Sequence, residues 1–239
     1  MVRRMSRRSS KKQPSPFTRD TLKFLVELRA NNRRDWFQEN KHRYESLVLD
    51  PALQFIDSMY DPLAELAPHF TAVAKRSGGS LMRVYRDTRF SKDKTPYKTN
   101  IGIQFRHELG RDAHAPGYYL HIEPEESFIG AGLWRPPSEP LRQIRERIAL
   151  KSGEWQRAIG DQTFADAFRL GGESLVRPPR GFDKDHALLD DIKRKDFIAV
   201  REILPADVTR AGFREELVQS IKAAEPLMRF LCKAVNAPF

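Results

Sequence analysis

The residues best suited to chemistry lie in one run, residues 83–100, with the sequence RVYRDTRFSKDKTPYKTN. Six cations fall within sixteen of these residues, interleaved with aromatic and aspartate side chains. Guanidinium groups bind phosphate or carboxylate in a bidentate manner, and a neighbouring carboxylate can fix their orientation. We therefore predict a site for an anionic ligand here. Its expected contacts are Arg83, Arg86, Asp87, Arg89, Lys92, Lys94, Tyr97 and Lys98.

The geometry expected for this site is an extended strand followed by a loop. Alternate side chains of a strand share a face, so Arg83, Asp87 and Arg89 would point the same way. Pro96 would fix the backbone of the loop, whose lysines could close over a bound anion. The competing interpretation is a structural network in which the arginines pair with Asp87, Asp93 and acidic groups elsewhere. The excess of six cations over two acids favours the anion site.

A second group is the pair His121 and Glu123 in the segment YYLHIEP. Residues two apart on a strand share a face, and histidine titrates near neutrality, so this pair could act in general acid/base chemistry. A metal site would need a third ligand from a distant segment, such as Asp183 or His186, because two ligands do not make a site. We therefore predict catalytic roles for His121 and Glu123, and we predict no metal ligands.

Another polar set lies in RPPRGFDKDHALLDDIKRKDF, residues 177–197. This stretch is rich in turn-forming residues at its start and helix-like from Ala187. We expect its polar side chains to add to the ligand site if the fold brings them to the first run. The residues concerned are Arg180, Asp183, His186 and Lys195.

Hydrophobic spacing divides the chain into helical parts and a central part with strands. Helical periodicity begins after Thr18, an expected N-cap, continues to about Leu66 and returns after Pro137. Alternation of apolar with polar residues in IGIQF and YYLHI indicates half-buried strands. FIAVREIL, at 197–204, is interpreted as a further strand, and a helix interrupted at Pro226 closes the chain.

After the second of these strands, the turn PEES would reverse the chain and start a further antiparallel strand, with Glu123 opposite Phe128. In that register His121 would face Gly130, and Tyr119 would face Gly132. The two glycines would leave open space on the sheet face that points away from the core. The alternative to a ligand pocket there is a closely packed helix, or a Tyr119 ring that covers a glycine.

These elements predict one α+β domain over residues 17–239, with a central antiparallel sheet of four or more strands flanked by N-terminal and C-terminal helices. Residues 1–16 read as a disordered basic arm, because residues 1–12 hold six cations and no acid. The formal net charge of +10 therefore leaves +4 for the rest of the chain. The arm could attract nucleic acid or anionic lipid, or only aid solubility.

Composition excludes several classes of protein. With 40% hydrophobic and 31% charged residues, the chain suits a protein with its own core and a charged surface. No segment approaches the roughly 18 uninterrupted apolar residues of a membrane span. The single cysteine, Cys232, excludes internal disulfides and cysteine metal clusters, and a cytoplasmic location fits. The nucleotide, hydrolase and zinc-protease motifs GxxxxGKS/T, GxSxG and HExxH do not occur.

The central string RDTRFSKDKTPYKTN occurs together with FLVELRANNRRDWFQENKHRYE, YYLHIEP, GAGLWRP and RGFDKDH. On these motifs the chain resembles a bacterial and fungal family known as domain of unknown function 2461, from Phe17 to about Leu231. The resemblance implies that residues 83–98 are a hallmark of that family. It implies no reaction, cofactor or catalytic residue, because the family has no established activity.

We hypothesise a cytoplasmic protein that binds a phosphorylated or otherwise anionic small molecule, and that is an enzyme if His121 and Glu123 act as acid/base groups. Its cofactor and oligomeric state stay open. The alternative is a nucleic-acid-binding module that uses the basic arm with Tyr85, Phe90 and Tyr97, although the modest charge of +4 disfavours it. In a third interpretation the charged run only holds the fold together.

Overall fold

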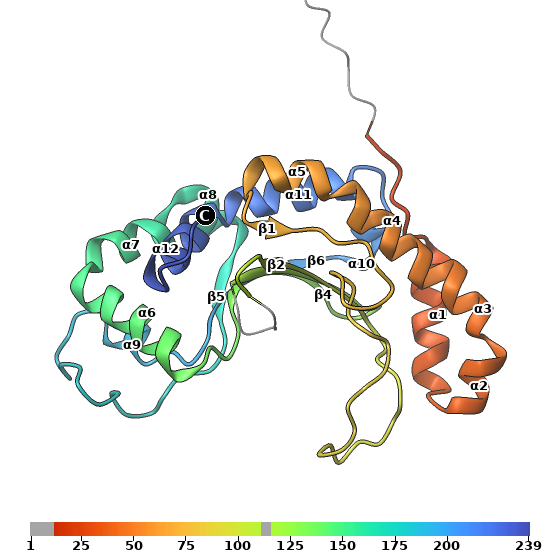
Figure 1. Cartoon of the computed structure of the whole chain (residues 1–239), viewed down its shortest axis with the longest axis horizontal. Coiled ribbons are helices and arrows are strands. Elements are labelled where there is room, and N and C mark those ends of the chain that lie inside the picture. Colours follow the sequence, from red (N-terminus) through yellow and green to blue (C-terminus); the bar gives the residue numbers. More distant parts are fainter. Residues whose placement is uncertain (1–11, 111–115) are drawn as a thin grey trace, which may run out of the picture.

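The computed structural model describes residues 12–110 and 116–239. In this part of the chain, six antiparallel strands form one sheet in the order β1-β2-β3-β4-β6-β5 (Figure 1). The predicted α+β fold with a central antiparallel sheet is thereby confirmed. The strands are β1 (Phe70–Thr71), β2 (Ile101–His107), β3 (Gly117–Ile122), β4 (Ser127–Leu133), β5 (Arg169–Gly171) and β6 (Phe197–Ile203).

The helices precede, interrupt and follow the strands. The first begins after Thr18, whose side chain and that of Thr21 cap each other's backbone N–H groups. The N-terminal helices are α1 (Arg19–Ala30), α2 (Arg34–Glu39), α3 (Lys41–Tyr44), the π-helical turn η1 (Glu45–Leu49), α4 (Asp50–Ser58) and α5 (Tyr60–Leu66). The later ones are α6 (Ser138–Leu150), α7 (Ser152–Gly160), α8 (Gln162–Ala167), α9 (Leu189–Ile192), α10 (Pro205–Val208), α11 (Phe213–Ala223) and α12 (Glu225–Ala234).

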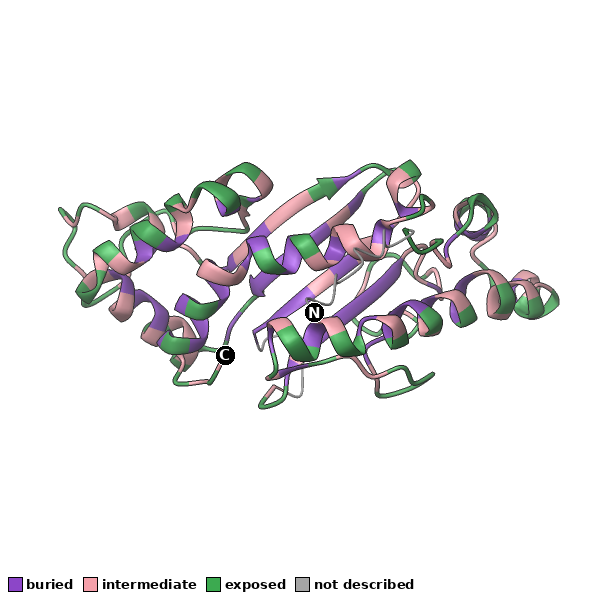
Figure 2. Ribbon diagram, turned by 90° about the horizontal axis from the view of Figure 1, so that it is seen from above, coloured by how far each residue is buried: buried purple, intermediate pink, exposed green. Residues whose placement is uncertain are grey.

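Helices cover one face of the sheet and leave the other uncovered. Figure 1 shows α4, α5 and α11 above the sheet, with α1–α3 at one end and α6–α9 and α12 at the other. The side chains of Ile103, Leu120 and Phe197 point into the covered side and are fully buried. The strands are correspondingly buried beneath partly exposed helices (Figure 2). Burial of these alternate residues fixes which strand face is turned away from the helices.

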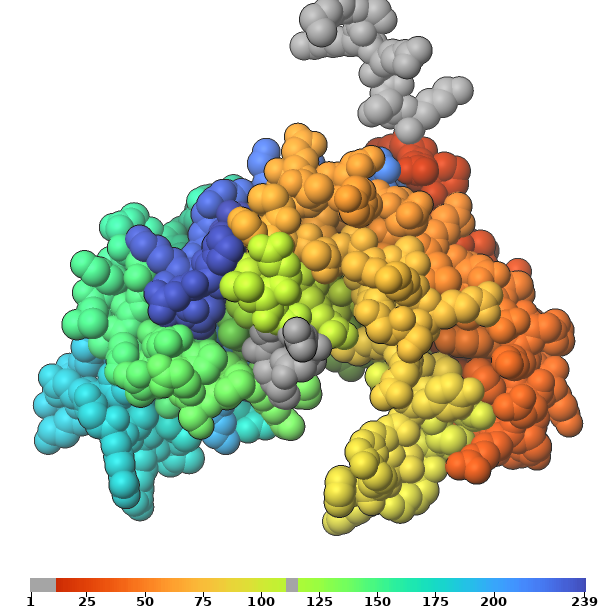
Figure 3. Space-filling view, in the orientation of Figure 1, coloured from red at the N-terminus to blue at the C-terminus, as the bar shows by residue number. Residues whose placement is uncertain are grey.

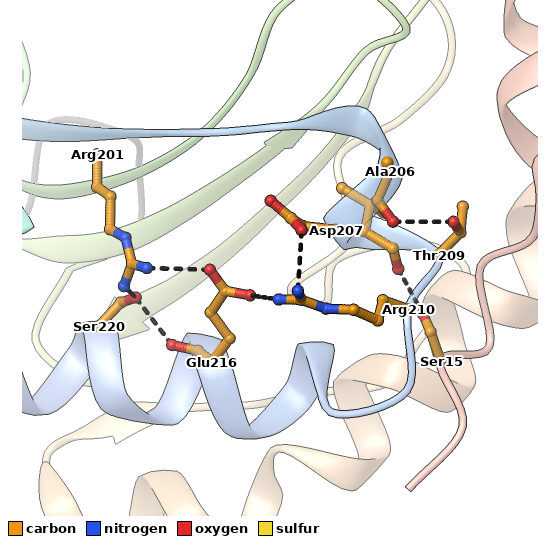
Figure 4. Close-up of polar contacts among 9 residues, drawn as sticks. Ser15, Arg201, Ala206, Asp207, Thr209, Arg210, Glu216 and Ser220 are labelled. Carbon is orange, nitrogen blue, oxygen red and sulfur yellow. Dashed lines mark hydrogen bonds and ion pairs between the residues drawn. The ribbon is translucent and has the colours of Figure 1, made fainter. Parts of the chain in front are cut away.

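A polar network ties β6 to the helices that cover the sheet (Figure 4). Arg201 of β6 donates to the Ser220 hydroxyl at 2.7 Å and to a carboxylate oxygen of Glu216 at 3.0 Å, both on α11. The other oxygen of Glu216 accepts from Arg210 at 3.1 Å. Charge-assisted bonds of this kind hold β6 and α11 in one relative position.

The segment after Leu81 does not form the predicted strand. Only two isolated bridges occur there, Leu81 with Ile103 and Tyr85 with Tyr97, and residues 83–98 fold back on themselves as an irregular hairpin. This hairpin, called the arm below, projects from the sheet on its uncovered side (Figure 1). Pairing with β2 ends because the arm runs beyond the first residue of that strand, where no other strand offers partners.

The hairpin of β3 and β4 has the predicted topology but a different register. His121 pairs with Phe128, and Tyr119 pairs with Gly130, two residues away from the predicted pairing. Ser127, which we assigned to the turn, instead begins β4, and its hydroxyl accepts from the Glu123 N–H at 3.0 Å and donates to the Glu123 carbonyl at 2.7 Å. These two bonds close the turn around residues 124–126.

Other predicted elements are found where they were expected. The segment from Phe197 is a strand, and the closing helix is divided into α11 and α12, with Pro226 in the first turn of α12. In the described residues no helix combines the length and apolar character needed to cross a bilayer. Most of the basic segment predicted at the N-terminus, residues 1–11, lies outside the described residues.

Candidate functional site

The uncovered sheet face carries a pocket of about 410 Å³, called the open-face pocket below. Alternate residues of β2, β3, β4 and β6 form its floor, and side chains at its margins form its walls. In Figure 3 this side of the molecule is hollowed between the arm and the segment around residues 172–188. The lining of the pocket includes Met82, Phe128, Trp134, Ile198 and Val200.

Two glycines of β4 keep the pocket floor low. A Cβ atom at Gly130 would meet only ordinary contacts, the nearest being the Tyr119 Cβ at 3.7 Å. Gly132 has a φ of +128° and a Cβ there would come within 2.0 Å of the Phe197 carbonyl oxygen, so only glycine fits. The Tyr119 ring does not cover Gly132. Its hydroxyl instead lies 2.9 Å from the position that a Cβ of Gly102 would take.

Two polar side chains of β3, Tyr119 and His121, and that of Glu123, which directly follows the strand, lie in a row beside this floor. Nε2 of His121 is 3.2 Å from Oε2 of Glu123, and Nδ1 of His121 is 3.1 Å from the Tyr119 hydroxyl. The amide nitrogen of Asn100 is also 3.3 Å from Nδ1. We call Tyr119, His121 and Glu123 the β3 polar chain. Tyr119 and His121 line the pocket, and Glu123 lies behind them.

The partners of His121 define its protonation pattern. A carboxylate oxygen of Glu123 only accepts, so Nε2 carries the hydrogen and the neutral ring leaves Nδ1 as an acceptor for the Tyr119 hydroxyl. The His121 ring also stacks on Phe128, with centroids 4.7 Å apart and an interplanar angle of 5°. Glu123 in turn accepts from the Thr99 hydroxyl at 2.9 Å. The histidine is therefore oriented from both sides.

Burial is the main electrostatic influence on Tyr119. It raises the pKa of the phenol to about 12, because the charged phenolate is disfavoured away from water. A hydrogen bond with Asn100 opposes this shift, and the charge of Glu123 adds to it. Tyr119 is therefore protonated at neutral pH. It can give a hydrogen bond or a proton to a group in the pocket, or to His121.

The arginines of the arm are placed differently from the expectation that they converge on a shared hollow. Arg86 donates to Asp93 and to Thr95, and Arg89 donates to Asp87 at 2.7 Å and 3.0 Å. Hydrogen bonds from the two arginines lower the pKa of both Asp87 and Asp93 to about 2. These pairs match the structural network that was the competing interpretation, and they occupy the guanidinium groups of Arg86 and Arg89.

Other cations of the predicted site are not neutralised in this way. In residues 12–110 and 116–239, Arg83, Lys92 and Lys98 have no hydrogen-bond or ion-pair partner for their side chains, and Lys94 donates only to the Thr88 carbonyl. Burial and the charge of Arg83 lower the pKa of Lys98. The two cations at the base of the arm are thus electrostatic neighbours.

Tyr97 lies in the core rather than at a binding surface. Its side chain is buried and stacks on Phe37, with ring centroids 4.0 Å apart. Asn32 bonds both its N–H and its carbonyl group, at 3.0 Å and 2.9 Å. Tyr97 therefore anchors the arm to the N-terminal helices, and its ring is not accessible to a ligand as we had expected.

The second polar set lies across the hollow from the arm (Figure 3). Asp183 accepts from the Asp185 N–H at 2.9 Å, and His186 accepts from the Leu188 N–H at 3.0 Å, so both stabilise local turns. Lys195 pairs with Glu173 at 3.1 Å, and Arg180 is exposed. The fold places this set and the arm on opposite sides of the uncovered sheet face. No group of three or more metal-ligating side chains occurs in the described residues.

Sequence reasoning missed several residues of the pocket. Trp134 lines it from the end of β4, and Arg135 lies over the indole ring at 4.9 Å. The buried Asp196 holds the Arg135 N–H at 2.7 Å and the Glu173 N–H at 2.9 Å. Trp134 directly follows the GAGL string, so the available signal in the sequence was a tryptophan just after two strand glycines.

Fold and site together define an α+β protein with a pocket on the uncovered face of its antiparallel sheet and a hydrogen-bonded Tyr-His-Glu row beside that pocket. A profile of the conserved hypothetical protein family DUF2461 matches residues 20–230. The chain therefore belongs to this family. No curated protein and no solved structure matches the chain.

Proposed function

We propose that the protein binds a small organic molecule with a flat apolar part and an acidic group in the open-face pocket, where the β3 polar chain exchanges a proton with it. The observation that carries the proposal is the position of the Tyr119–His121 hydrogen bond at the surface of an otherwise apolar pocket. Apolar pockets with a few oriented polar groups are typical of small-molecule sites.

The shape of the pocket supports a flat ligand. Its floor at Gly130 is bare backbone, and its margins carry the rings of Phe128 and Trp134. Aromatic side chains at such margins favour planar or apolar groups through stacking and burial. A ring lying on the glycine floor would bring its substituents near the Tyr119 hydroxyl.

Two cations support the acidic character of the ligand. Lys98 is half-buried and lies near Arg83, so each charge disfavours the other. Both lie at the base of the arm, where Thr99 contacts Glu123 and Met82 lines the pocket. A phosphate or carboxylate between the two cations would remove this repulsion.

The β3 polar chain supports acid/base chemistry. Tyr119 would donate its proton to an oxygen or nitrogen atom of the ligand and become a phenolate. Nδ1 of neutral His121 carries no hydrogen, so His121 would return a proton to this phenolate only after it has taken one up from water and become a histidinium. Glu123 would stabilise the histidinium that forms when His121 takes up a proton. A cytoplasmic setting is part of the proposal and is supported by the buried, unpaired thiol of Cys232.

A fragment screen by amide NMR tests the proposal. The fragments are aromatic carboxylates and aryl phosphates, each with its neutral ester or amide as a matched control. We expect acidic fragments to shift the Gly130, Gly132 and Tyr119 resonances. We expect Lys98→Gln to lower the affinity for acidic fragments about tenfold and to leave the affinity for neutral fragments unchanged. Fragments that bind only outside these resonances, or bind equally well when neutral, would show the assignment to be wrong.

One observation favours nucleic-acid binding as a second function. Phe90 in the arm is 95% exposed, with the Arg89 guanidinium 5.8 Å from its ring centre. Exposed aromatic rings next to cations provide stacking platforms for single-stranded bases. Buried Tyr97 is no longer available for this purpose. Binding of a single-stranded oligonucleotide across a salt series, with Phe90→Ala as the variant, separates this function from the first.

A further inference from the structure

A second cavity lies between the arm and the helix α2, apart from the open-face pocket. Its volume is about 530 Å³. Its lining comes from two segments that are far apart in the sequence, residues 32–34 at the start of α2 and both halves of the arm. We call this cavity the arm–helix cleft. It is lined by Asn32, Arg33, Arg34, Thr88, Lys94, Thr95 and Pro96, none of which lines the open-face pocket.

The charge of the cleft has one sign. Its lining contains three cations, Arg33, Arg34 and Lys94, and no carboxylate. Three like charges that face one volume repel each other, so an anion placed among them would be stabilised. The cleft therefore has the electrostatic requirement of an anion site, which the paired arginines of the arm lack.

The cations of the cleft differ in how far they are already neutralised. Arg33 pairs with Asp35 at 3.1 Å, and both side chains are largely exposed. The Lys94 ammonium donates to the Thr88 carbonyl at 2.9 Å, which orients the charge without neutralising it. Arg34 has no ion-pair or hydrogen-bond partner for its side chain anywhere in residues 12–110 and 116–239. Two of the three charges are thus available to a ligand.

Asp93, the acid that precedes Lys94 in the arm, does not oppose an anion strongly. Asp93 accepts hydrogen bonds from Arg86, from the Thr95 hydroxyl at 3.0 Å and from the Thr95 N–H at 2.9 Å. Its charge is therefore compensated within the arm. The field in the cleft is left to Arg34 and Lys94.

The two sides of the cleft are held at a fixed separation. Asn32 bonds both backbone groups of Tyr97, at 2.9 Å and 3.0 Å, in the manner of a neighbouring strand. The ring of Tyr97 stacks on Phe37 of α2 with centroids 4.0 Å apart. These contacts attach the base of the arm to the N-terminal helices. The cations are consequently brought together before any ligand arrives, which lowers the entropic cost of binding.

We infer that the arm–helix cleft is a binding site for a phosphomonoester, with Arg34 and Lys94 as the principal contacts to the phosphate. A phosphomonoester carries about −1.5 to −2 charges at neutral pH and several acceptor oxygens, which matches two or three converging cations. The cleft is larger than a phosphate group, so it leaves room for the organic part of the ester. The Thr88 hydroxyl provides an additional donor at the cleft wall.

Phosphate titrations followed by amide NMR test this site. The probes are inorganic phosphate, glycerol 3-phosphate and a short oligothymidylate that lacks a terminal phosphate, each against sodium chloride of equal ionic strength. We expect the first two to shift the Asn32, Thr88 and Lys94 amides with a saturable dependence, and chloride to leave these amides unchanged. An oligothymidylate that binds while inorganic phosphate and glycerol 3-phosphate both fail would overturn the assignment and favour a polynucleotide.

Matched variants make the test specific. Arg34→Gln and Lys94→Gln should each weaken binding of glycerol 3-phosphate about tenfold, because each removes a charge-assisted hydrogen bond. Arg177→Gln is the control. Arg177 is exposed, lies in the segment across the hollow from the arm, and has no side-chain partner in the described residues. Equal melting temperatures confirm that the exposed substitutions leave the fold intact. If the Arg177 variant is weakened as much as the Arg34 variant, or neither changes, the cleft is not the site.

Discussion

Tyr119 connects the open-face pocket with the polar row on β3. Its ring packs over Gly102, and its hydroxyl reaches Nδ1 of His121 at 3.1 Å. A side chain at Gly102 would displace this hydroxyl, so the glycine and the tyrosine form one structural unit. The raised pKa of Tyr119 keeps the hydrogen in place for donation at neutral pH.

The contribution of Tyr119 to the free energy of unfolding should depend on pH. In the unfolded chain the phenol ionises near its ordinary pKa of 10.0, whereas in the folded protein it stays protonated until about pH 12. The contribution is therefore complete below pH 10 and is lost as the pH rises through this window. Its size is on the order of 3 kcal/mol, from a shift of roughly two pKa units.

Denaturant unfolding of the parent and of Tyr119→Phe, at a series of pH values up to about 12, measures this contribution. The stability advantage of the parent over the variant should shrink as the pH passes 10. Other groups that ionise at high pH affect both proteins and cancel in the difference. An advantage that stays constant would mean that the hydroxyl is solvated in the folded protein.

At the residue scale, the sequence predicted which side chains share a strand face, but it did not predict which side chains pack against distant segments. The spacing of His121 and Glu123 placed them on one face, and their polar atoms lie 3.2 Å apart. Tyr97 was expected at a ligand, yet it is buried against Phe37. The pattern could not reveal this because Phe37 is distant in the sequence and belongs to a helix.

The arm is the element whose structure differs most from the prediction. Its alternating side chains suggest a strand, but pairing stops once the segment leaves β2 at Leu81. Beyond that point backbone hydrogen bonds at 2.7 Å and 2.9 Å join the two halves of the arm near its base, and ion pairs of Arg86 with Asp93 and of Arg89 with Asp87 stabilise the rest. A strand pattern predicts pairing only where a partner edge is available, and the sequence does not indicate how long that edge is.

The tip of the arm should loosen in acid before the sheet does. The Asp87 and Asp93 carboxyls have an ordinary pKa of 3.8, and hydrogen bonds from Arg89 and Arg86 lower it to about 2. A lowered pKa stabilises the arm at pH values above 3.8, and this stabilisation is lost as the pH falls through about 2. The interval between these values is the window to examine.

Amide NMR follows this transition through Thr95, whose N–H donates to Asp93 at 2.9 Å. We expect its resonance to titrate near pH 2, while the Ile103 amide in β2 shows no change at that point. Asp93→Asn should abolish the Thr95 titration and leave the Ile103 amide in place. A midpoint near 3.8 in the parent would show that Arg86 does not hold Asp93 in solution.

Register is a second feature of elements that the sequence left unresolved. Both the predicted and the observed pairing put His121 and Tyr119 on the uncovered face, because the two registers differ by an even number of residues. The Ser127 hydroxyl bonds to Glu123 decided between them. Turn composition alone did not distinguish a serine in the turn from a serine that opens the strand.

The whole molecule has the form of an arch, with helices above the sheet and the arm and residues 172–188 as its two sides (Figures 1 and 3). Alternation in IGIQF and YYLHI predicted half-buried strands. The prediction is confirmed for β3, where Tyr119 and His121 are partly exposed between buried neighbours, but residues 101–105 of β2 are all buried. The sequence could not show which segments stand beside the uncovered face. That arrangement depends on contacts such as the one between Asn32 and Tyr97, which are 65 positions apart in the chain.

The shape of the arch separates two predicted sites. The open-face pocket lies on the sheet itself, whereas the arm–helix cleft lies between the arm and α2. The run of charges along the arm predicted a single anion site, but Arg86 and Arg89 are paired with Asp93 and Asp87 within the arm. Ligands of the pocket and of the cleft should therefore bind independently of one another.

Filling the pocket floor tests the central claim most directly. A Cβ at Gly130 has only ordinary contacts, and valine favours strands, so Gly130→Val should fold while its methyl groups occupy the pocket. Gly160→Val is the control, because Gly160 ends α7, a Cβ there would meet nothing within 4 Å, and it does not line this pocket.

The measurement is a calorimetric titration of an aromatic carboxylate or aryl phosphate, selected by binding to the parent, into the parent and both variants. We predict that Gly130→Val weakens binding about tenfold or more and that Gly160→Val leaves it unchanged. Equal affinities of the parent and the Gly130→Val variant, with both folded, would contradict a ligand site on the uncovered face of the sheet.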